Sequence, residues 1–506
     1  MASKAQIMNA LTGMGLVVAF SISAFGADKK MEDRTVMAYV KDALRGDPRV
    51  SAFDITVGVD SGIVTLSGTV DNMAARKFAD REAKKLDGVL GVVNKIVVAP
   101  TWRLDSDIRD AIRRRILNSA VIVSEDIKVA CSEGKVALSG TVNSWTESEE
   151  AGLVASEVRG VKEVVNNISV HWPTQRTDQE IKNDAVDKLK RDVYLTQAPI
   201  TVTVKDGEIT LTGSVGTAYQ KDRAHDDLSW LANVKDVRNE LKVEWWERNG
   251  VREKVPQLSD TALEDAVRNE LNADSRLKGS NITVTASFGA VTLAGTVANH
   301  KEKQIAEQDA MDVVGVAWVS NNLFALADER ADWSIRSDVD FNLVTDVITD
   351  GFELGVKVRN GVVTLSGHVH TWYEADHARD VAARVKGVKD VINQISIDNY
   401  QPATTVRGYS AAQVVAEIKK GLKANGTTKW AYDTIDVTVK DGVATLAGRV
   451  TTWAERSEAA NVAFATRGVW EVKNKLAVEG YDYNWGQYEG LDYPLSYPLS
   501  YPRNSP

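Results

Sequence analysis

The chain of 506 residues contains only one cysteine and six histidines, and it has no long apolar run after its amino terminus. A single cysteine cannot form an internal disulfide. No recurring histidine and aspartate partners surround Cys131, so we interpret it as a small core residue and not as a nucleophile. After residue 26 no stretch approaches the ~20 apolar residues of a membrane-spanning helix. The formal net charge of −9 disfavours nucleic acid as a partner, because phosphate binding requires clustered Lys and Arg.

The first 26 residues are typical of an export signal. Lys4 supplies positive charge, an apolar stretch runs from Leu11 to Phe20, and Ala24-Phe25-Gly26 forms a small-x-small cleavage site. We expect cleavage after Gly26 and a periplasmic location. The alternative is a retained anchor helix, which the short and interrupted apolar stretch disfavours.

One phrase, G-x-V/A/I-x-L-x-G-x-V, occurs six times. Its second glycine recurs at nearly regular intervals, which indicate one small domain per copy: Gly68, Gly140, Gly213, Gly295, Gly367 and Gly448. An alternating run such as Ile55, Val57 and Val59 precedes each phrase, and Asp-Gly or Asn-Gly pairs in several copies predict a tight antiparallel hairpin. The recurring glycine faces inward, where it either lets a helix pack closely or marks a bulge.

Each hairpin belongs to a unit of helix, strand, strand, helix and strand. Apolar residues at three- and four-residue steps predict the helices. The closing phrase G/N-V-x-x-V-x-N-x-I/L predicts the third strand, parallel to the second. Its asparagine faces the core, where we expect it to bond a neighbouring loop backbone, and it recurs as Asn94, Asn166, Asn239, Asn321, Asn393 and Asn474. The predicted fold class is α+β, a tandem array of six small domains, each a three-stranded mixed sheet with two helices on one face.

The repeats define the domain boundaries. We predict a signal peptide at 1–26, repeats 1 to 6 at 31–99, 102–171, 176–244, 259–326, 331–398 and 408–479, and a tail rich in Tyr and Pro at 480–506. Regular proline forbids helix in the tail, and its composition predicts disorder. Longer spacings place linkers at 247–259 and 399–409. We therefore expect repeats adjacent in sequence to touch and distant repeats to fold separately.

The glycine phrase, the helix after it and the closing asparagine strand together resemble the BON domain, a small bacterial module named for osmotically inducible and nodulation proteins. The resemblance covers all six repeats, about residues 31 to 479. It implies an exported, non-catalytic domain of cell-envelope proteins linked to osmotic stress, which associates with phospholipid membrane or other envelope components. No catalytic motif, cofactor or metal ligand follows from it, and we identify no small-molecule substrate.

Three groups of residues are candidates for a more specific role. Basic residues beside a tryptophan form an amphipathic patch that predicts contact with lipid: Trp102, Arg103, Arg109, Arg113, Arg114 and Arg115. The alternative is that these residues form an ordinary solvated helix face. A histidine group in repeat 5 offers a possible metal site against the simpler interpretation of solvated side chains: His368, His370 and His377. A tryptophan three residues after the phrase is interpreted as a core plug at the helix start, with an exposed interface anchor as the alternative: Trp145, Trp372 and Trp453.

The leading functional hypothesis is a periplasmic, multivalent protein that binds phospholipid membrane or other envelope components through many weak contacts, because linked modules raise one another's local concentration. The alternative is a chaperone-like or scaffolding protein whose exposed sheet faces bind protein clients. An enzyme is disfavoured, because no set of nucleophile, base and orienting residue is recognisable.

Overall fold

The structure is a computed structural model that describes residues 31–50, 53–172, 176–244, 258–327, 329–397 and 410–479. The predicted export signal, most of the first linker, all of the second linker and the tail lie outside the described residues. Every repeat has the predicted order of helix, strand, strand, helix and strand, so the α+β tandem fold is confirmed. Within the described residues no helix is both long and apolar enough to cross a membrane.

The elements of the six repeats correspond one to one. The first helices are α1 (Asp33–Gly46), α3 (Asp105–Leu117), α5 (Asp178–Arg191), α7 (Asp260–Ala273), α9 (Asp332–Thr345) and α11 (Ala411–Ala424). The hairpins are β1 (Ile55–Asp60) with β2 (Ile63–Val70), β4 (Ile127–Ser132) with β5 (Lys135–Val142), β7 (Ile200–Lys205) with β8 (Glu208–Val215), β11 (Asn281–Ser287) with β12 (Ala290–Val297), β14 (Gly355–Arg359) with β15 (Val362–Val369), and β17 (Ile435–Lys440) with β18 (Val443–Val450).

The second helices are α2 (Met73–Lys84), α4 (Trp145–Ser156), α6 (Ala218–Ser229), α8 (His300–Asp312), α10 (Trp372–Ala383) and α12 (Trp453–Phe464). The third strands are β3 (Gly91–Val98), β6 (Glu163–Val170), β9 (Asp236–Asn239) with β10 (Lys242–Val243), β13 (Trp318–Ala325), β16 (Asp390–Ile397) and β19 (Glu471–Val478). A short 3-10 helix, η1 (Ser275–Leu277), follows α7. In each sheet the second strand is central, antiparallel to the first strand and parallel to the third.

The hairpin turns and the recurring glycine both depend on positive φ angles. Ser61 and Gly62 have φ values of 53° and 78°, as the predicted tight turn requires. Gly68 has φ 137°, and a Cβ there would lie 2.5 Å from the carbonyl oxygen of Asp54, just before β1. The close neighbour is therefore the backbone at the start of the first strand and not a helix, so of the two interpretations left open the close helix packing is wrong.

The recurring asparagine joins the third strand to the second helix. In repeat 1 the Nδ2 of Asn94 donates to the carbonyl oxygen of Arg76 on α2 at 3.0 Å, and its Oδ1 accepts from the Ile96 amide at 3.1 Å. The same pair of bonds occurs in all six repeats. The backbone role is as expected, although the partner is a helix and not a loop.

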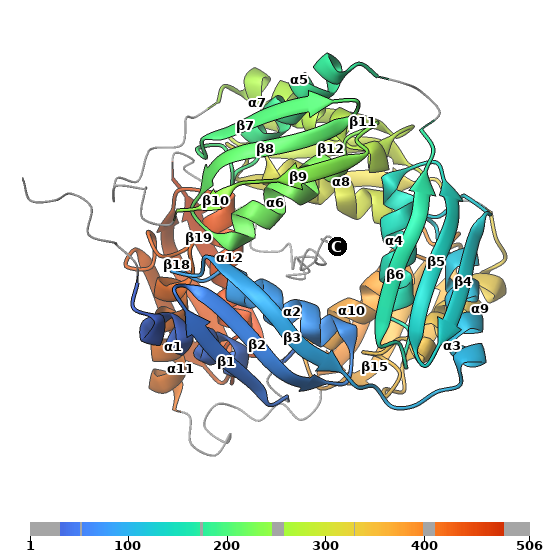
Figure 1. Cartoon of the computed structure of the whole chain (residues 1–506), viewed down its shortest axis with the longest axis horizontal. Coiled ribbons are helices and arrows are strands. Elements are labelled where there is room, and N and C mark those ends of the chain that lie inside the picture. Colours follow the sequence, from blue (N-terminus) through green and yellow to red (C-terminus); the bar gives the residue numbers. More distant parts are fainter. Residues whose placement is uncertain are drawn as a thin grey trace, which may run out of the picture.

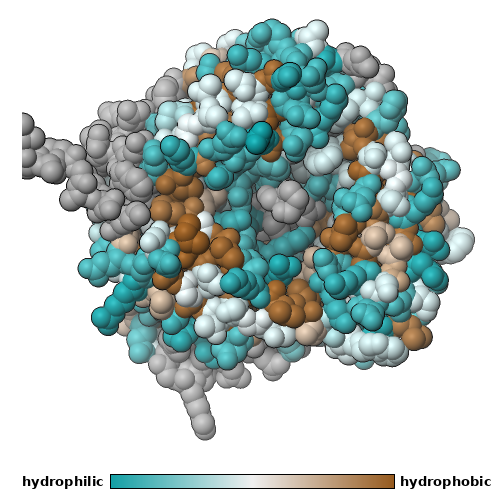
Figure 2. All heavy atoms as spheres, in the orientation of Figure 1, coloured by the Kyte–Doolittle hydropathy of each residue, from teal (hydrophilic) through white to brown (hydrophobic). Residues whose placement is uncertain are grey.

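The six repeats form a closed particle of two layers (Figure 1), and the space-filling view shows a hollow at its centre (Figure 2). Repeats 1, 2 and 3 make the front layer, and the chain returns through repeats 4, 5 and 6 behind them. Repeat 1 lies over 6, 2 over 5 and 3 over 4. Isolated backbone bridges join the members of each pair: Leu86 with Asn425, Ser119 with Val385, Val158 with Asp346, Asp192 with Val313, and Leu231 with Asp274. Repeats distant in sequence are thus in contact, and the expectation of separate distant domains is wrong.

Buried polar residues mark these pair contacts. The residue that caps the carboxyl end of the first helix is Asp or Asn in all six repeats and is buried in each: Asp47, Asn118, Asp192, Asp274, Asp346 and Asn425. Each repeat also has its own apolar core, in repeat 1 built around Val36, Leu66 and Ile96. The particle therefore consists of six small cores held together by interfaces rich in hydrogen bonds and ion pairs.

Two of the three singled-out tryptophans pack between repeats. Trp453 of repeat 6 is buried in the core cluster of repeat 4. The ring of Trp372 lies 4.7 Å from that of Phe464 and packs against the cores of repeats 1 and 6. Both tryptophans thus pack against apolar cores, as the core interpretation expects, but these cores belong to other repeats, and the side chains fill the contacts between repeats.

Candidate functional site

The outward surface of pair 2–5 is built from α3 and α9, which pack side by side. The Nζ of Lys386 donates to the carbonyl oxygen of Leu117 at 3.2 Å, and Arg330, just before α9, donates to the carbonyl oxygen of Lys386 at 2.9 Å. The start of α9 therefore lies beside the end of α3. The corresponding contact at the other end joins Arg159 to Asp350.

Large apolar side chains are exposed at both ends of this helix pair. Trp333 is 76% exposed and Leu117 is 69% exposed at one end. At the other end Val344 is 68% exposed, and Trp102 and Leu104, just before α3, are 77% and 52% exposed. We call these five residues the helix-pair surface. Exposed apolar groups gathered in this way mark interaction sites more often than isolated ones do.

Arginines accompany the apolar residues. Arg109 is half-buried with its Nε 3.0 Å from Asp110 Oδ1, and Arg336 on α9 has its Nε 3.5 Å from Asp340 Oδ2. Arg113 is exposed and makes no ion pair within the described part of the chain. Arg103 is half-buried near Gly160. Aromatic rings beside arginine are typical of surfaces that lie at the interface of a membrane with water.

Two of the arginines predicted for this patch have other roles. Arg115 is 2% exposed, with its Nη2 3.0 Å from Glu157 Oε2 and its Nη1 3.3 Å from Asp346 Oδ2. Arg114 lies over the ring of Phe341 at 3.9 Å and pairs with Asp338 at 3.2 Å. Both arginines hold α3 against repeat 5. The prediction that Arg115 contacts lipid is therefore wrong, because its charge is buried and neutralised inside the protein.

The other two pairs do not carry the helix-pair surface. At the second position of the first helix, where α9 has Trp333, the other helices have Arg34, Ser106, Gln179, Thr261 and Ala412. At the thirteenth position, where α3 and α9 have Leu117 and Val344, the others have Arg45, Lys190, Asn272 and Lys423. The surface thus singles out one of three otherwise equivalent sides of the particle.

A buried charge network underlies the surface. The Nε2 of His377 lies 2.7 Å from Asp346 Oδ1, and neither side chain is exposed. Burial alone lowers the pKa of His377, but the charge and hydrogen bond of Asp346 outweigh it and raise the pKa above its ordinary value. Burial raises the pKa of Asp346, and His377 and then Arg115 reverse this effect, so its pKa is lowered. The bond between His377 and Asp346 therefore belongs to the structure that holds α9 in place.

The histidine group does not assemble into a metal site. His377 is taken up by Asp346, His368 Nδ1 lies 2.7 Å from Ser396 Oγ, and His370 packs edge-on against Phe352. Among the described residues no cluster of three metal-ligating side chains is found.

Cys131 is half-buried, and burial together with Asp105 raises the pKa of its thiol to about 11, so it is protonated at neutral pH.

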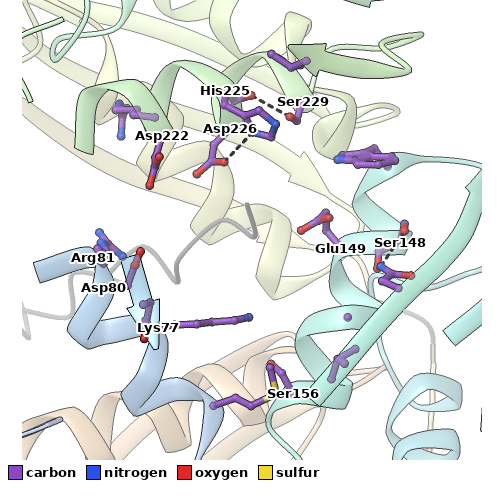
Figure 3. A pocket seen from close by; sticks show the side chains of 18 of the residues that line it. Lys77, Asp80, Arg81, Ser148, Glu149, Ser156, Asp222, His225, Asp226 and Ser229 are labelled. Atoms are coloured by element: carbon purple, nitrogen blue, oxygen red, sulfur yellow. Dashed lines mark hydrogen bonds and ion pairs between the residues drawn. The ribbon is translucent and has the colours of Figure 1, made fainter. Parts of the chain in front are cut away.

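A central cavity of about 850 Å³ opens between the second helices of repeats 1 to 3. Figure 3 shows Lys77 on α2, Glu149 on α4 and Asp222 on α6 directed toward it from three sides. Lys84 Nζ lies 2.6 Å from Asp222 Oδ2 and joins two of the walls. Burial lowers the pKa of Lys77 despite the glutamates near it.

The same cavity contains a serine, a histidine and an aspartate on α6. The hydroxyl of Ser229 donates to the backbone carbonyl of His225 at 2.9 Å and not to its ring, while Nδ1 of His225 faces Asp226 at 3.3 Å. This is the geometry of a helix turn and not of a nucleophile with its base.

Sequence reasoning missed Trp333, Leu117, Val344 and Leu104. On a helical wheel Trp333, Leu117 and Val344 are each one apolar residue on a polar face, which is an ordinary feature of helix surfaces, and Leu104 lies just before its helix. Their shared location depends on the contact between repeats 2 and 5, which lie far apart in the sequence. A search for apolar residues at helix positions that are polar in the other repeats would have found Leu117 and Val344.

The architecture is that of a repeat protein built from one α-β-β-α-β module. Six stretches of the chain, residues 32–100, 104–171, 177–244, 259–325, 331–399 and 410–480, match the BON domain. The chain therefore belongs to the BON domain family, as the resemblance of its repeats implied.

Three bacterial proteins are similar to parts of the chain. Osmotically-inducible protein Y of Escherichia coli is 34% identical over 145 residues, which are 27% of this chain and 72% of that protein. Outer membrane lipoprotein DolP of Haemophilus influenzae is 32% identical over 142 residues, 27% of this chain and 73% of that protein. The 21 kDa hemolysin of Actinobacillus pleuropneumoniae is 29% identical over 148 residues, 28% of this chain and 73% of that protein.

Proposed function

We propose that this protein is an exported, non-catalytic protein of the bacterial cell envelope that associates peripherally with a phospholipid surface through the helix-pair surface. One observation carries the proposal: the exposed Trp102, Leu117, Trp333 and Val344 lie beside Arg109 and Arg113 on one side of the particle, and the two equivalent sides lack them. The names of two relatives, one osmotically inducible and one an outer membrane lipoprotein, support a role in osmotic or envelope stress.

The energetics favour weak, reversible binding. Fully burying one large apolar side chain contributes about 1.5–3 kcal/mol, and these side chains would be only partly buried in a headgroup region. An arginine near an anionic surface adds about 1 kcal/mol. The net charge of −9 opposes approach to that surface. Binding should therefore depend on both the apolar residues and the local arginines, and it should weaken in salt.

Co-sedimentation with vesicles of phosphatidylglycerol and phosphatidylethanolamine, at low and high salt, tests the proposal. Leu117→Asn with Val344→Asn gives pair 2–5 the residue that repeat 4 has at this helix position, Asn272, and should reduce binding about tenfold or more. The matched control is Asn272→Ala on pair 3–4, which should bind like the parent. A parent chain that binds no vesicles at any salt concentration, or a double variant that binds like the parent, would refute the proposal.

A second candidate function, the binding of protein clients, is favoured by a different surface. The outer faces of the third strands expose Val93, Val97, Val165, Phe324 and Ile392. In Figure 2 apolar residues gather beside the central hollow, over β3 and β6. Suppression of client aggregation that is lost in Val93→Ser with Val165→Ser, and kept in Leu117→Asn with Val344→Asn, would favour this function over membrane association.

A further inference from the structure

Two buried positions lie at the contact between the layers. The first, position 11, is the eleventh residue of each first helix. The second, position 13, is the thirteenth residue counted from the start of each second helix. At position 11 one pair has Lys188 and Glu270, which form an ion pair between repeats 3 and 4. At position 13 another pair has Glu157 and Arg384, 2.9 Å apart between repeats 2 and 5.

The side chains at both positions differ from pair to pair, and within each pair they are compatible in charge and size. At position 11 the pairs 1–6, 2–5 and 3–4 have Ala43 with Gly421, Arg115 with Asn342, and Lys188 with Glu270. At position 13 they have Lys85 with Ala465, Glu157 with Arg384, and Trp230 with Asp312. The charged members are buried, and each has a counter-charge across or beside its own interface.

Residues outside the two positions supply the remaining counter-charges and ring contacts across the interfaces. Lys85 Nζ lies 3.1 Å from Glu458 of repeat 6, and Asp312 Oδ2 lies 2.8 Å from Arg223 of repeat 3. Arg276 of repeat 4 lies over the ring of Trp230 at 4.5 Å. Each buried charge thus has a counter-charge supplied by its partner repeat, while Lys85, Arg115 and Arg384 have a second one within their own repeat: Glu82, Glu157 and Asp380.

Two other stackings of the layers are conceivable, because each layer has three similar repeats. Turning one layer by a third of a turn one way pairs 1 with 5 and 2 with 4. Lys85 would then face Arg384, and Glu157 would face Asp312. Turning it the other way pairs 1 with 4 and 2 with 6, and Arg115 would face Gly421 while Glu270 would face Ala43. Each turn also creates one pair of opposite charges, Arg115 with Glu270 in the first case and Lys85 with Asp312 in the second. Like charges, or charges without their partner-repeat counter-charge, would nevertheless be buried in both cases.

We infer that the side chains at positions 11 and 13 select the stacking register of the two layers. They exclude the two wrong registers through repulsion or missing counter-charges. If all three pairs used the same favourable contact, that contact would form equally well in every register and could not select one of them. The register in turn places α3 beside α9. The inference rests on the pair contacts alone and not on the proposed membrane function.

Cross-linking of introduced cysteines measures the register in the full chain. In a Cys131→Ser background, Arg159→Cys with Asp350→Cys reports pair 2–5, because these residues form a partly exposed ion pair. Asp42→Cys with Lys420→Cys reports pair 1–6 for the same reason. A short bis-maleimide should join both reporter pairs within one chain, and the joined form migrates differently on a denaturing gel.

Arg384→Glu places a like charge against Glu157 and should slow cross-linking at both reporters by about tenfold or more. Adding Glu157→Gln removes this like charge and leaves Arg115 paired with Asp346, so it should raise both rates above those of Arg384→Glu alone. The matched control is Glu163→Arg, a charge reversal at an exposed site of the same repeat, where Glu163 pairs with exposed Lys135. This variant should leave both rates unchanged.

Two results would overturn the inference. One is a double variant that cross-links no faster than Arg384→Glu, since charge matching would then not decide the pairing. The other is loss of the 2–5 reporter alone with the 1–6 reporter at the parent rate, since the position would then act only locally. If Arg384→Glu does not fold, Arg384→Gln, Glu157→Gln and their combination replace it. Losses in the combination smaller than the product of the single losses support the inference, and multiplicative losses overturn it.

Discussion

Arg113 and Arg115 stand two positions apart on α3, and the structure predicts opposite consequences for their loss. Arg115 neutralises two buried carboxylates, Glu157 at 3.0 Å and Asp346 at 3.3 Å. Breaking a buried pair by removing one partner costs about 3–5 kcal/mol. Glu157 keeps Arg384, and Asp346 keeps His377, so we expect Arg115→Gln to cost about 3 kcal/mol, the lower end of this range.

Arg113→Gln changes an exposed side chain, so its effect on the free energy of unfolding should stay within about 0.5 kcal/mol. Its effect on membrane binding should be larger. One arginine near an anionic surface contributes about 1 kcal/mol, which corresponds to about a fivefold change in affinity. High salt should remove most of this difference.

Urea unfolding followed by circular dichroism measures stability for both variants, and vesicle co-sedimentation at low and high salt measures binding. We predict a lower unfolding midpoint for Arg115→Gln alone and a lower affinity at unchanged midpoint for Arg113→Gln. Limited proteolysis of Arg115→Gln should cut both repeat 2 and repeat 5, because the lost contact joins them. Equal destabilisation by the two substitutions would refute the assignment of Arg115 to the interface.

Three further predictions concern the inward glycine, the buried histidine and export. Gly140→Ala should lower the free energy of unfolding by about 1–3 kcal/mol or more, because φ is 124° and the Cβ would overlap the carbonyl oxygen of Asp126. Gly58→Ala, with open space around its Cβ, should be tolerated in the same melting experiment. Stabilisation by His377 should be complete below about pH 6.5 and lost as the pH rises through its raised folded-state pKa. His377→Gln should therefore reduce the fall of the melting temperature toward alkaline pH. An unchanged pH profile would contradict this prediction. The exported chain should begin at Ala27 by mass spectrometry, and a full-length chain in the cytoplasmic fraction would contradict export.

The fold of each repeat could be predicted because its signals are local. Alternation at Ile55, Val57 and Val59 defines a strand with one buried face, and the residues of the turn define the hairpin. The recurring asparagine is predictable as a structural residue, because a polar side chain on a core face must find a partner. These signals lie within a few residues of one another.

The arrangement of the six repeats in two layers could not be predicted, because the contacts between the layers join residues that are far apart in the sequence. Lys188 and Glu270 are 82 positions apart, and each alone is a charged residue near the end of an amphipathic helix, which is normally solvated. Arg115 follows two other arginines and resembled part of a basic patch for the same reason. Trp453 has the spacing of a core residue of repeat 6 and is buried instead against repeat 4. Only the pairing of the layers shows which of these residues are buried.

The most direct test of the central claim is to measure which side of the particle faces the membrane. In a Cys131→Ser background, an environment-sensitive fluorophore is attached either at Trp333→Cys on α9 or at Ala412→Cys, the equivalent position on α11. Vesicles that contain a lipid-linked quencher are then added. We predict a blue shift and quenching for the label at position 333 and little change at position 412. Equal quenching at both positions, or quenching at 412 alone, would contradict the claim that repeats 2 and 5 form the membrane-facing surface.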